Sequence, residues 1–246
     1  MTAARTGQPD LEEPSAPLAH WLRHEWTPAD SELLGRGYQA RAWLAHSPVG
    51  PVVIKQPLDS PLLGRLGRMT LRSEAETYRR LAGIPGIPRC LGLIEGCLLI
   101  EHIDGPSFRS AEASLADRDR FFALLLETLE AMHASGVAHG DLKRKDNILV
   151  GPGERPYVID FGIAWRADPD SPRWRRAVFE TVRQMDLNAW IKLKYRRKFD
   201  ALAPEDAARY RPLPLERAAR AVRIMWQKLT FRRWRKRRRN RLSRSG

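Results

Sequence analysis

The segment from Val137 to Ala164, VAHGDLKRKDNILVGPGERPYVIDFGIA, constrains this chain more than any other feature. Two acids, Asp141 and Asp160, stand in His-Gly-Asp and Asp-Phe-Gly, and Lys143 and Asn147 follow the first acid at fixed offsets. Carboxylate and amide oxygens are ligands that Mg²⁺ prefers. Phosphoryl transfer needs charge neutralisation and alignment more than covalent work by the protein. The segment therefore indicates chemistry on a metal-bound phosphate.

Each of these residue types suits one part of that chemistry. Asp141 can orient an acceptor hydroxyl and take its proton, and Lys143 can hold the transferring phosphate. Asn147 and Asp160 can bind a metal through oxygen atoms. The apolar stretches that flank the link between the acids predict two paired strands, which would hold the acids rigidly.

The rest of the chain predicts a small sheet followed by helices. An N-terminal arm is expected over 1–30, which is rich in proline, alanine and acids. Apolar runs and glycine turns between 31 and 103 predict strands, and periodic apolar residues predict a helix over 68–83. Further helices are expected from a Ser114 cap to Gly136, around 177–199, and from about Leu215.

In these motifs the chain resembles the protein-kinase superfamily over about residues 31–165. HGDLKRKDN and DFG are similar to the family's catalytic loop and its Asp-Phe-Gly, and upstream stretches match in the same order. The resemblance implies an α+β, bilobed kinase-like fold. It would have a small antiparallel-sheet N-lobe with a hinge over 31–103 and a shortened helical C-lobe over 104–214. An apolar stripe beside a cationic run separately predicts a basic amphipathic C-terminal helix over 215–246.

The resemblance also implies ATP and Mg²⁺ as ligands. Lys55, at the end of VVIK, would grip the α- and β-phosphates, and the register of the following helix selects Glu74 over Glu76 as its partner. Gly35 and Gly37 lie in a stretch similar to the glycine-rich phosphate loop. The stretch LLIEHIDGPSF looks like the hinge that binds adenine through its backbone, with Ile100 as gatekeeper and Glu101–Ile103 as the hinge itself.

Three departures from the family pattern bear on regulation and on the acceptor. Ala40 replaces the third loop glycine, and Gly140 replaces the arginine that pairs with an activation-segment phosphate. The chain after Gly162 is short and lacks an Ala-Pro-Glu element. Such compact C-lobes resemble lipopolysaccharide-core sugar kinases and RIO-type kinases. In these, a later acid often braces the catalytic loop, and Asp186 is the candidate, although a helix-surface acid fits the sequence as well.

The basic character of the chain is concentrated at its end. The formal net charge is +14, and residues 216–246 hold 13 Lys and Arg with Glu216 as their only acid. Tryptophans among arginines suit an anionic inner-membrane surface, and nucleic acid is the less favoured partner.

The two cysteines suit buried thiols in a reducing compartment, and no signal or spanning segment is recognised. These features favour a cytoplasmic protein, peripheral on the inner membrane.

The leading interpretation is an ATP- and Mg²⁺-dependent kinase that phosphorylates a hydroxyl, more readily a lipopolysaccharide-core sugar than a protein. The alternative is a RIO-like serine/threonine protein kinase. A non-catalytic pseudokinase that binds a partner is a second alternative, and a nucleic-acid-associated factor that uses the basic tail is a third. The retained Lys55, Asp141, Asn147 and Asp160 argue against the pseudokinase, because a scaffold does not need all four.

Overall fold

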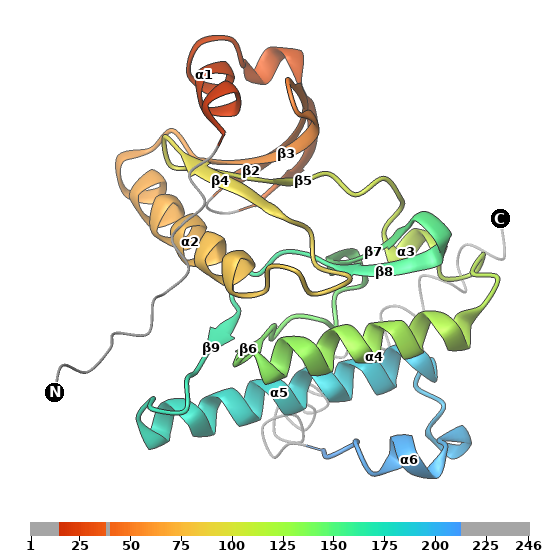
Figure 1. The fold of residues 1–246 in the computed structure, drawn as a ribbon. Helices are drawn as coiled ribbons and strands as arrows, with labels where there is room; N and C mark the ends of the chain where they lie inside the picture. The colour runs from red at the N-terminus through yellow and green to blue at the C-terminus, as the bar shows by residue number, and fades with distance from the viewer. Residues whose placement is uncertain (1–14, 38–39, 213–246) are drawn as a thin grey trace, which may run out of the picture.

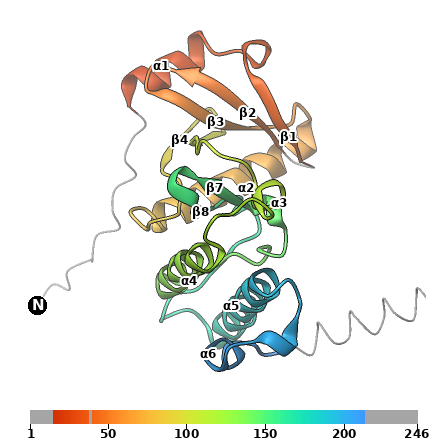
Figure 2. The ribbon, with the colours of Figure 1, turned by 90° about the vertical axis from the view of Figure 1, so that its right-hand side faces the viewer.

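The computed structural model describes residues 15–37 and 40–212. Its upper part is a sheet with helices against it, and its lower part is mainly helical (Figures 1 and 2). The upper sheet is antiparallel with the strand order β1-β2-β3-β5-β4. Its strands are β1 Glu32–Arg36, β2 Ala40–Ser47, β3 Gly50–Pro57, β4 Cys90–Ile94 and β5 Cys97–Glu101. This confirms the expected α+β kinase-like fold, while the basic helix expected over 215–246 lies outside the described residues.

Six α-helices and two short two-stranded sheets complete the described part of the chain. The helices are α1 Ala16–His24, α2 Pro61–Arg80, α3 Phe108–Ala111, α4 Arg118–Ala134, α5 Arg173–Lys194 and α6 Pro204–Ala207. The paired strands are β6 Val137–Ala138 with β9 Trp165–Arg166, and β7 Ile148–Gly151 with β8 Arg155–Val158. Single 3₁₀ turns cover Pro28–Asp30, Lys145–Asn147, Pro152–Glu154 and Phe199–Ala201.

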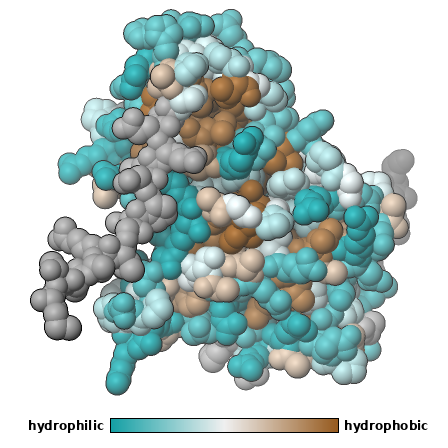
Figure 3. Space-filling model, viewed as in Figure 1, coloured by the Kyte–Doolittle hydropathy of each residue, from teal (hydrophilic) through white to brown (hydrophobic). Residues whose placement is uncertain are grey.

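Helix α1 corrects the expectation of an arm over 1–30. Leu18, Trp21 and Leu22 recur at helical spacing and are buried. They pack with Val52 and Ile54 of β3 in one apolar cluster. The described residues before Ser31 thus belong to the upper lobe, because their apolar stripe covers one face of its sheet. Seen from the side of Figure 1, hydrophobic side chains gather on the surface over the sheet below α1 (Figure 3).

The lower lobe is built on a large shared core. Stacked and edge-on aromatic rings of Phe108, Phe121 and Phe122 lie between α3 and α4. Trp190 of α5 reaches this group, and its indole nitrogen donates to the backbone oxygen of Phe122 over 2.9 Å. A tryptophan this deeply buried needs such a partner for its N–H. The packing fixes α5 against α4.

The N-cap of α4 is Asp117, so the Ser114 cap expected from the sequence is wrong. The Asp117 side chain accepts a hydrogen bond from the backbone nitrogen of Arg120 over 2.9 Å. Ser114 instead donates to the backbone oxygen of Ala111. Both residues are good caps, and the turn that follows α3 decides between them.

Gly105 is a position where a side chain should destabilise the fold. It has a φ of +155°, and an added Cβ would lie 2.0 Å from the backbone oxygen of Val150. We expect Gly105→Ala to lower the free energy of unfolding by about 3 kcal/mol, through strain and overpacking together. Gly83→Ala is the matched control, because Gly83 has a φ of +83° but open space around it. Chemical denaturation should show a loss of about 1 kcal/mol for the control, and equal losses in both variants would contradict the close approach.

Candidate active site

Lys55 lies at the centre of a group of charged side chains. Alternation along β3 sends Val52 and Ile54 toward α1, so Lys55 points to the opposite face, toward α2. Its ammonium lies 2.6 Å from Oε1 of Glu74 and 2.9 Å from Oδ1 of Asp160. Burial disfavours the charged form of Lys55, but the two carboxylates raise its pKa well above its ordinary value. The site therefore holds a permanent cation between two acids.

Asp160 and Phe161 are fixed by α2 through their backbone. Asp160 has a φ of +68°, and its nitrogen donates to the Tyr78 hydroxyl over 3.3 Å. The nitrogen of Phe161 donates to Oε1 of Glu74 over 3.1 Å. The Phe161 ring meets Tyr78 edge-on, 4.9 Å between centroids. Helix α2 thus holds both the lysine partner and the Asp-Phe-Gly turn.

Tyr78 is a site residue that sequence reasoning missed, because it reads as one more apolar position of the helix. It is fully buried, and burial raises the pKa of its hydroxyl far above the ordinary value. A buried tyrosine one turn after Glu74 requires a polar partner for its hydroxyl. The need for a polar partner was the one sign in the sequence that Tyr78 has a role beyond packing, although it does not identify the partner.

Asp186 of α5 braces the catalytic loop. Its Oδ2 accepts from the backbone nitrogen of His139 over 2.7 Å, and its Oδ1 accepts from that of Gly140 over 2.9 Å. Oδ2 also lies 3.2 Å from Nε2 of His133. Of the two interpretations left open by the sequence, the brace is therefore the one that forms. Gly140 adopts a φ of +81°, which suits glycine at this turn.

The loop residues around Asp141 are joined by hydrogen bonds. The backbone nitrogen of Asp141 donates to Nδ1 of His139 over 3.2 Å, and Nε2 of that ring lies 2.9 Å from the oxygen of Ile159. Asn147 donates from Nδ2 to the backbone oxygen of Asp141 over 3.2 Å. The backbone of Asn147 also accepts from Ile159, next to Asp160, over 3.0 Å. These bonds bring Asp141, Asn147 and Asp160 to one place, where Lys55 also lies.

Two cations lie beside the Asp141 carboxylate. Nζ of Lys143 is 3.7 Å from Oδ1, and a guanidinium nitrogen of Arg144 is 3.8 Å from Oδ2. The Lys143 side chain is 73% exposed, whereas that of Asp141 is 15% exposed. Lys143 can therefore move toward a bound anion, while Asp141 is held in place.

Asn147 and Asp160 fit a magnesium ion. The Asn147 amide uses its nitrogen on Asp141, which leaves its oxygen as the free end. Burial opposes ionisation of Asp160, but Lys55 holds the pKa of that carboxyl below its ordinary value. Within residues 15–37 and 40–212 no cluster of three or more His, Cys, Asp or Glu could hold a metal ion. A metal that keeps waters and phosphate oxygens suits this sparse set.

The upper-lobe residues that were expected to contact a nucleotide are described only in part. Gly35 lies in β1 beside a bulge, and the nitrogen of Gly37 donates to the oxygen of Ala40 over 2.9 Å. The tip between them and β2, residues 38–39, lies outside the described residues. Glu101 ends β5, and its nitrogen donates to the oxygen of Arg89 over 2.9 Å. Ile103 follows in the connection to the lower lobe and is buried.

Asp146, which precedes Asn147 in the loop, is 43% exposed and forms a surface ion pair. Its carboxylate oxygens lie 2.7 and 2.9 Å from Nε of Arg109 on α3. This pair turns Asp146 away from Asp141, so the catalytic loop has one acid facing the site. The sequence alone does not show which of the two acids of this loop points toward the site.

The connection from Asp-Phe-Gly to α5 is short. Only residues 163–172 separate Gly162 from the start of α5, and they include the two-residue strand β9. Arg166 of β9 donates to the backbone oxygen and the hydroxyl of Ser73 on α2, both over 3.1 Å, and pairs with Glu76. The segment is thus bonded directly to the helix that carries Glu74.

Replacing Asp186 with asparagine should loosen the loop. Both Asp186 oxygens accept hydrogen bonds from backbone N–H groups, and an amide nitrogen can only donate. We expect Asp186→Asn to cost about 2 to 4 kcal/mol of unfolding free energy, because a buried N–H loses its acceptor. Glu180→Gln, on the exposed side of the same helix, should change stability by less than about 0.5 kcal/mol. Denaturant midpoints with equal slopes would measure both, and a neutral Asp186→Asn would refute the brace.

Known proteins that resemble this chain are kinases. It is 31% identical over 168 residues to the probable serine/threonine-protein kinase PkwA of Thermomonospora curvata, which covers 62% of this chain and 21% of that protein. It is 33% identical over 148 residues to the serine/threonine-protein kinase PknD of Mycobacterium tuberculosis, covering 56% and 22%. The CBL-interacting protein kinase 25 of Oryza sativa is 30% identical over 176 residues, covering 65% and 32%. No protein-family model matches the chain.

The fold and these matches support the protein-kinase-like superfamily and an ATP-dependent phosphotransferase. The chain spans only about a fifth to a third of the length of these relatives. The matches do not show the lipopolysaccharide-core or RIO-type branch expected from the compact C-lobe. They fit the protein-kinase alternative better than the leading interpretation of a sugar acceptor.

Proposed function

We propose that this chain is an ATP- and Mg²⁺-dependent kinase that phosphorylates a serine or threonine hydroxyl of a protein. The observation that carries the proposal is the bonded group that joins Lys55, Glu74 and Asp160 to the loop of Asp141 and Asn147. The protein acceptor is supported by the names of the relatives, which are serine/threonine protein kinases.

In this proposal each residue has one task. Lys55, held by Glu74, binds the α- and β-phosphates, and Gly35 and Gly37 let the backbone approach them. The backbone of Glu101 and Ile103 binds adenine. Asn147 and Asp160 hold Mg²⁺, which supplies charge neutralisation on the phosphates when bound.

The remaining tasks fall on the acceptor side. Asp141 orients the acceptor hydroxyl and receives its proton, because its backbone is held by the loop and its carboxylate lies between Lys143 and Arg144. Lys143, which is long and exposed, steadies the transferring phosphoryl group. The Asp141 carboxylate and the Lys143 ammonium are 3.7 Å apart, so the two groups can act on the same hydroxyl.

A sugar hydroxyl, as in a lipopolysaccharide core, is the second candidate acceptor. The short connection over 163–172 favours it, because little chain is available there to bind an extended peptide. Small hydroxyl acceptors need less surface than peptides do. This candidate differs from the first in the acceptor alone, and the assigned site residues are the same.

The test is transfer of label from [γ-³²P]ATP in the presence of Mg²⁺, with a protein extract and a lipid extract of the cell envelope as separate acceptors. Label in protein, released as phosphoserine or phosphothreonine, supports the first candidate. Label in the lipid fraction alone supports the second. Absence of transfer to either, with ATP still bound, would favour the pseudokinase.

For the cellular setting we propose a cytoplasmic protein that binds an anionic inner-membrane surface through its basic tail, residues 215–246. The support is the concentration of arginine and tryptophan in that sequence. The tail lies outside the described residues. None of the helices in the described part of the chain is long and apolar enough to cross a bilayer. RNA remains the less favoured partner of the tail.

A further inference from the structure

The first half of α2 exposes an unusual number of hydrophobic side chains. Leu62 is 69% exposed, Met69 is 63% exposed, and Leu63 and Leu66 are each 42% exposed. These are four of the nine large hydrophobic residues that are exposed in the described part of the chain. They occupy little more than two helical turns, so they form a patch and not scattered contacts.

The core does not use these side chains. Gly64, Gly67 and Leu71 are buried and face the lobe from this half of the helix. An added Cβ on Gly64 would lie 2.4 Å from the backbone oxygen of Leu58, so glycine is needed for this close contact. The helix therefore packs through its glycines, and its leucines face outward. Folding of the lobe does not explain them.

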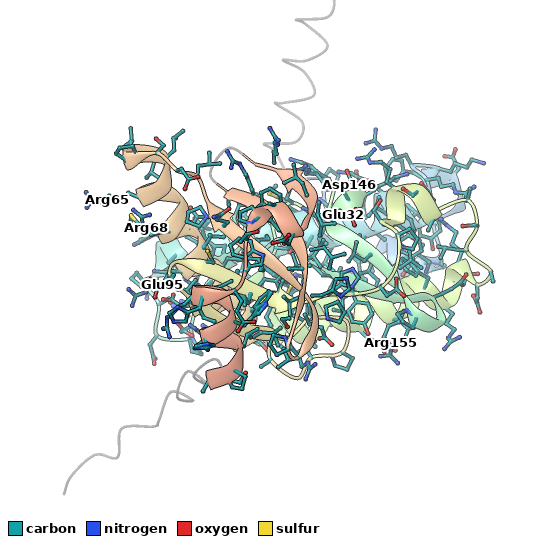
Figure 4. All side chains as sticks on the ribbon, turned by 90° about the horizontal axis from the view of Figure 1, so that it is seen from above. Glu32, Arg65, Arg68, Glu95, Asp146 and Arg155 are labelled. Carbon is teal, nitrogen blue, oxygen red and sulfur yellow. The ribbon has the colours of Figure 1, made fainter. Side chains whose placement is uncertain are left out.

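A stripe of arginines runs beside the apolar stripe. Leu62, Leu66 and Met69 recur at helical spacing, and Arg65, Arg68 and Arg72 recur on the neighbouring side. Arg65 and Arg68 lie on the outer side of α2 (Figure 4), where the stem of Arg68 runs beside Gly96 between β4 and β5. Neither of them forms an ion pair within residues 15–37 and 40–212, and Arg72 approaches only Glu76, at 3.8 Å.

We propose that this face of α2, formed by Leu62, Leu63, Leu66 and Met69 with Arg65, Arg68 and Arg72, docks on an anionic phospholipid surface. In such a surface the phosphates lie above the acyl chains. A helix with exposed apolar side chains and arginines along one edge can insert the apolar side chains among the acyl chains and keep the arginines beside the phosphates. The charges decide the partner, because an apolar protein partner would leave the arginines without counter-charges. The face is separate from the basic tail and does not depend on kinase activity.

The experiment locates the face directly in the full-length chain. Leu62→Cys carries an environment-sensitive dye, and Val49→Cys, at an apolar turn position that is also exposed, at 53%, is the matched control. The native thiols react slowly, because burial raises the pKa of Cys97 to about 11 and raises that of Cys90 as well. With phosphatidylcholine vesicles that contain phosphatidylglycerol, the dye at position 62 should shift to the blue and the dye at position 49 should not.

Partition into the same vesicles gives the second measurement. Leu62→Gln with Met69→Gln should lower the partition coefficient by about tenfold. Arg65→Gln with Arg68→Gln should lower it by about fivefold for each arginine at low salt. Val49→Gln, and Arg120→Gln with Arg155→Gln, should leave it within about twofold. All these side chains are exposed, so the variants should fold, as circular dichroism can verify.

Four results would overturn the proposal. The first is the absence of a blue shift at position 62 while the chain is bound to vesicles, which would assign binding to the tail alone. The second is equal partition of the α2 variants and the controls. The third is no binding of the wild-type chain to anionic vesicles. The fourth is a doubled mass without vesicles that Leu62→Gln with Met69→Gln abolishes, which would make the face a contact between two copies.

Discussion

Asp160→Ala should reduce Mg²⁺-dependent phosphoryl transfer by about 10³-fold. The variant removes the carboxylate whose pKa Lys55 holds low and which is proposed to bind metal. Lys55 keeps its 2.6 Å contact with Glu74, so the upper lobe should remain assembled. Measured ATP affinity should therefore lose its dependence on Mg²⁺ while the protein stays folded.

The control for this variant is Asp168→Ala. Asp168 also follows the Asp-Phe-Gly turn closely, but its exposed carboxylate lies 2.6 Å from Arg80 and away from Lys55. Its transfer rate should stay within about twofold of the wild-type rate. If Asp160→Ala retains a normal rate and a normal magnesium dependence, the metal is held elsewhere and the proposed site is wrong.

Several features of the site could be read from the sequence because they depend on local spacing. The glycine-bounded apolar runs predicted the strands that carry Gly35 and Lys55. The motif register of the resemblance to kinases selected Glu74, and this is the acid that pairs with Lys55. Residue spacings of 2 and 3.6 predict strands and helices reliably, because they reflect which face of each element is buried. Such patterns place a side chain on a face but do not name its partner.

The missed features all depend on partners far away in the sequence. Arg109 and Asp146 are 37 residues apart, and the Tyr78 hydroxyl meets a nitrogen 82 residues later. Asp186 could be a brace or a surface acid until α5 was placed against the loop, 47 residues from His139. Helix α1 was hidden by the proline-rich composition around it, although its three buried residues have helical spacing. Tertiary contacts, and not local preference, decided each case.

Asp141→Asn should lower the transfer rate by about 10²- to 10⁴-fold while ATP affinity stays within about twofold. An amide cannot receive the hydroxyl proton, so the rate falls. The nucleotide contacts proposed for Lys55, Asn147 and Asp160 do not involve the Asp141 side chain. The loop should also keep its shape, because His139 and Asn147 bond to the Asp141 backbone.

Asp146→Asn is the matched control for that change, in the same loop and with the same chemistry. Its carboxylate points to Arg109, so its loss should leave the transfer rate within about twofold. Steady-state rates and nucleotide titrations of both variants separate the two roles. A collapse of ATP binding in Asp141→Asn would place this acid among the nucleotide ligands. A normal rate would assign proton acceptance to another group. Either result removes Asp141 from the acceptor side, which we propose for it because its carboxylate lies 3.7 Å from the exposed Lys143.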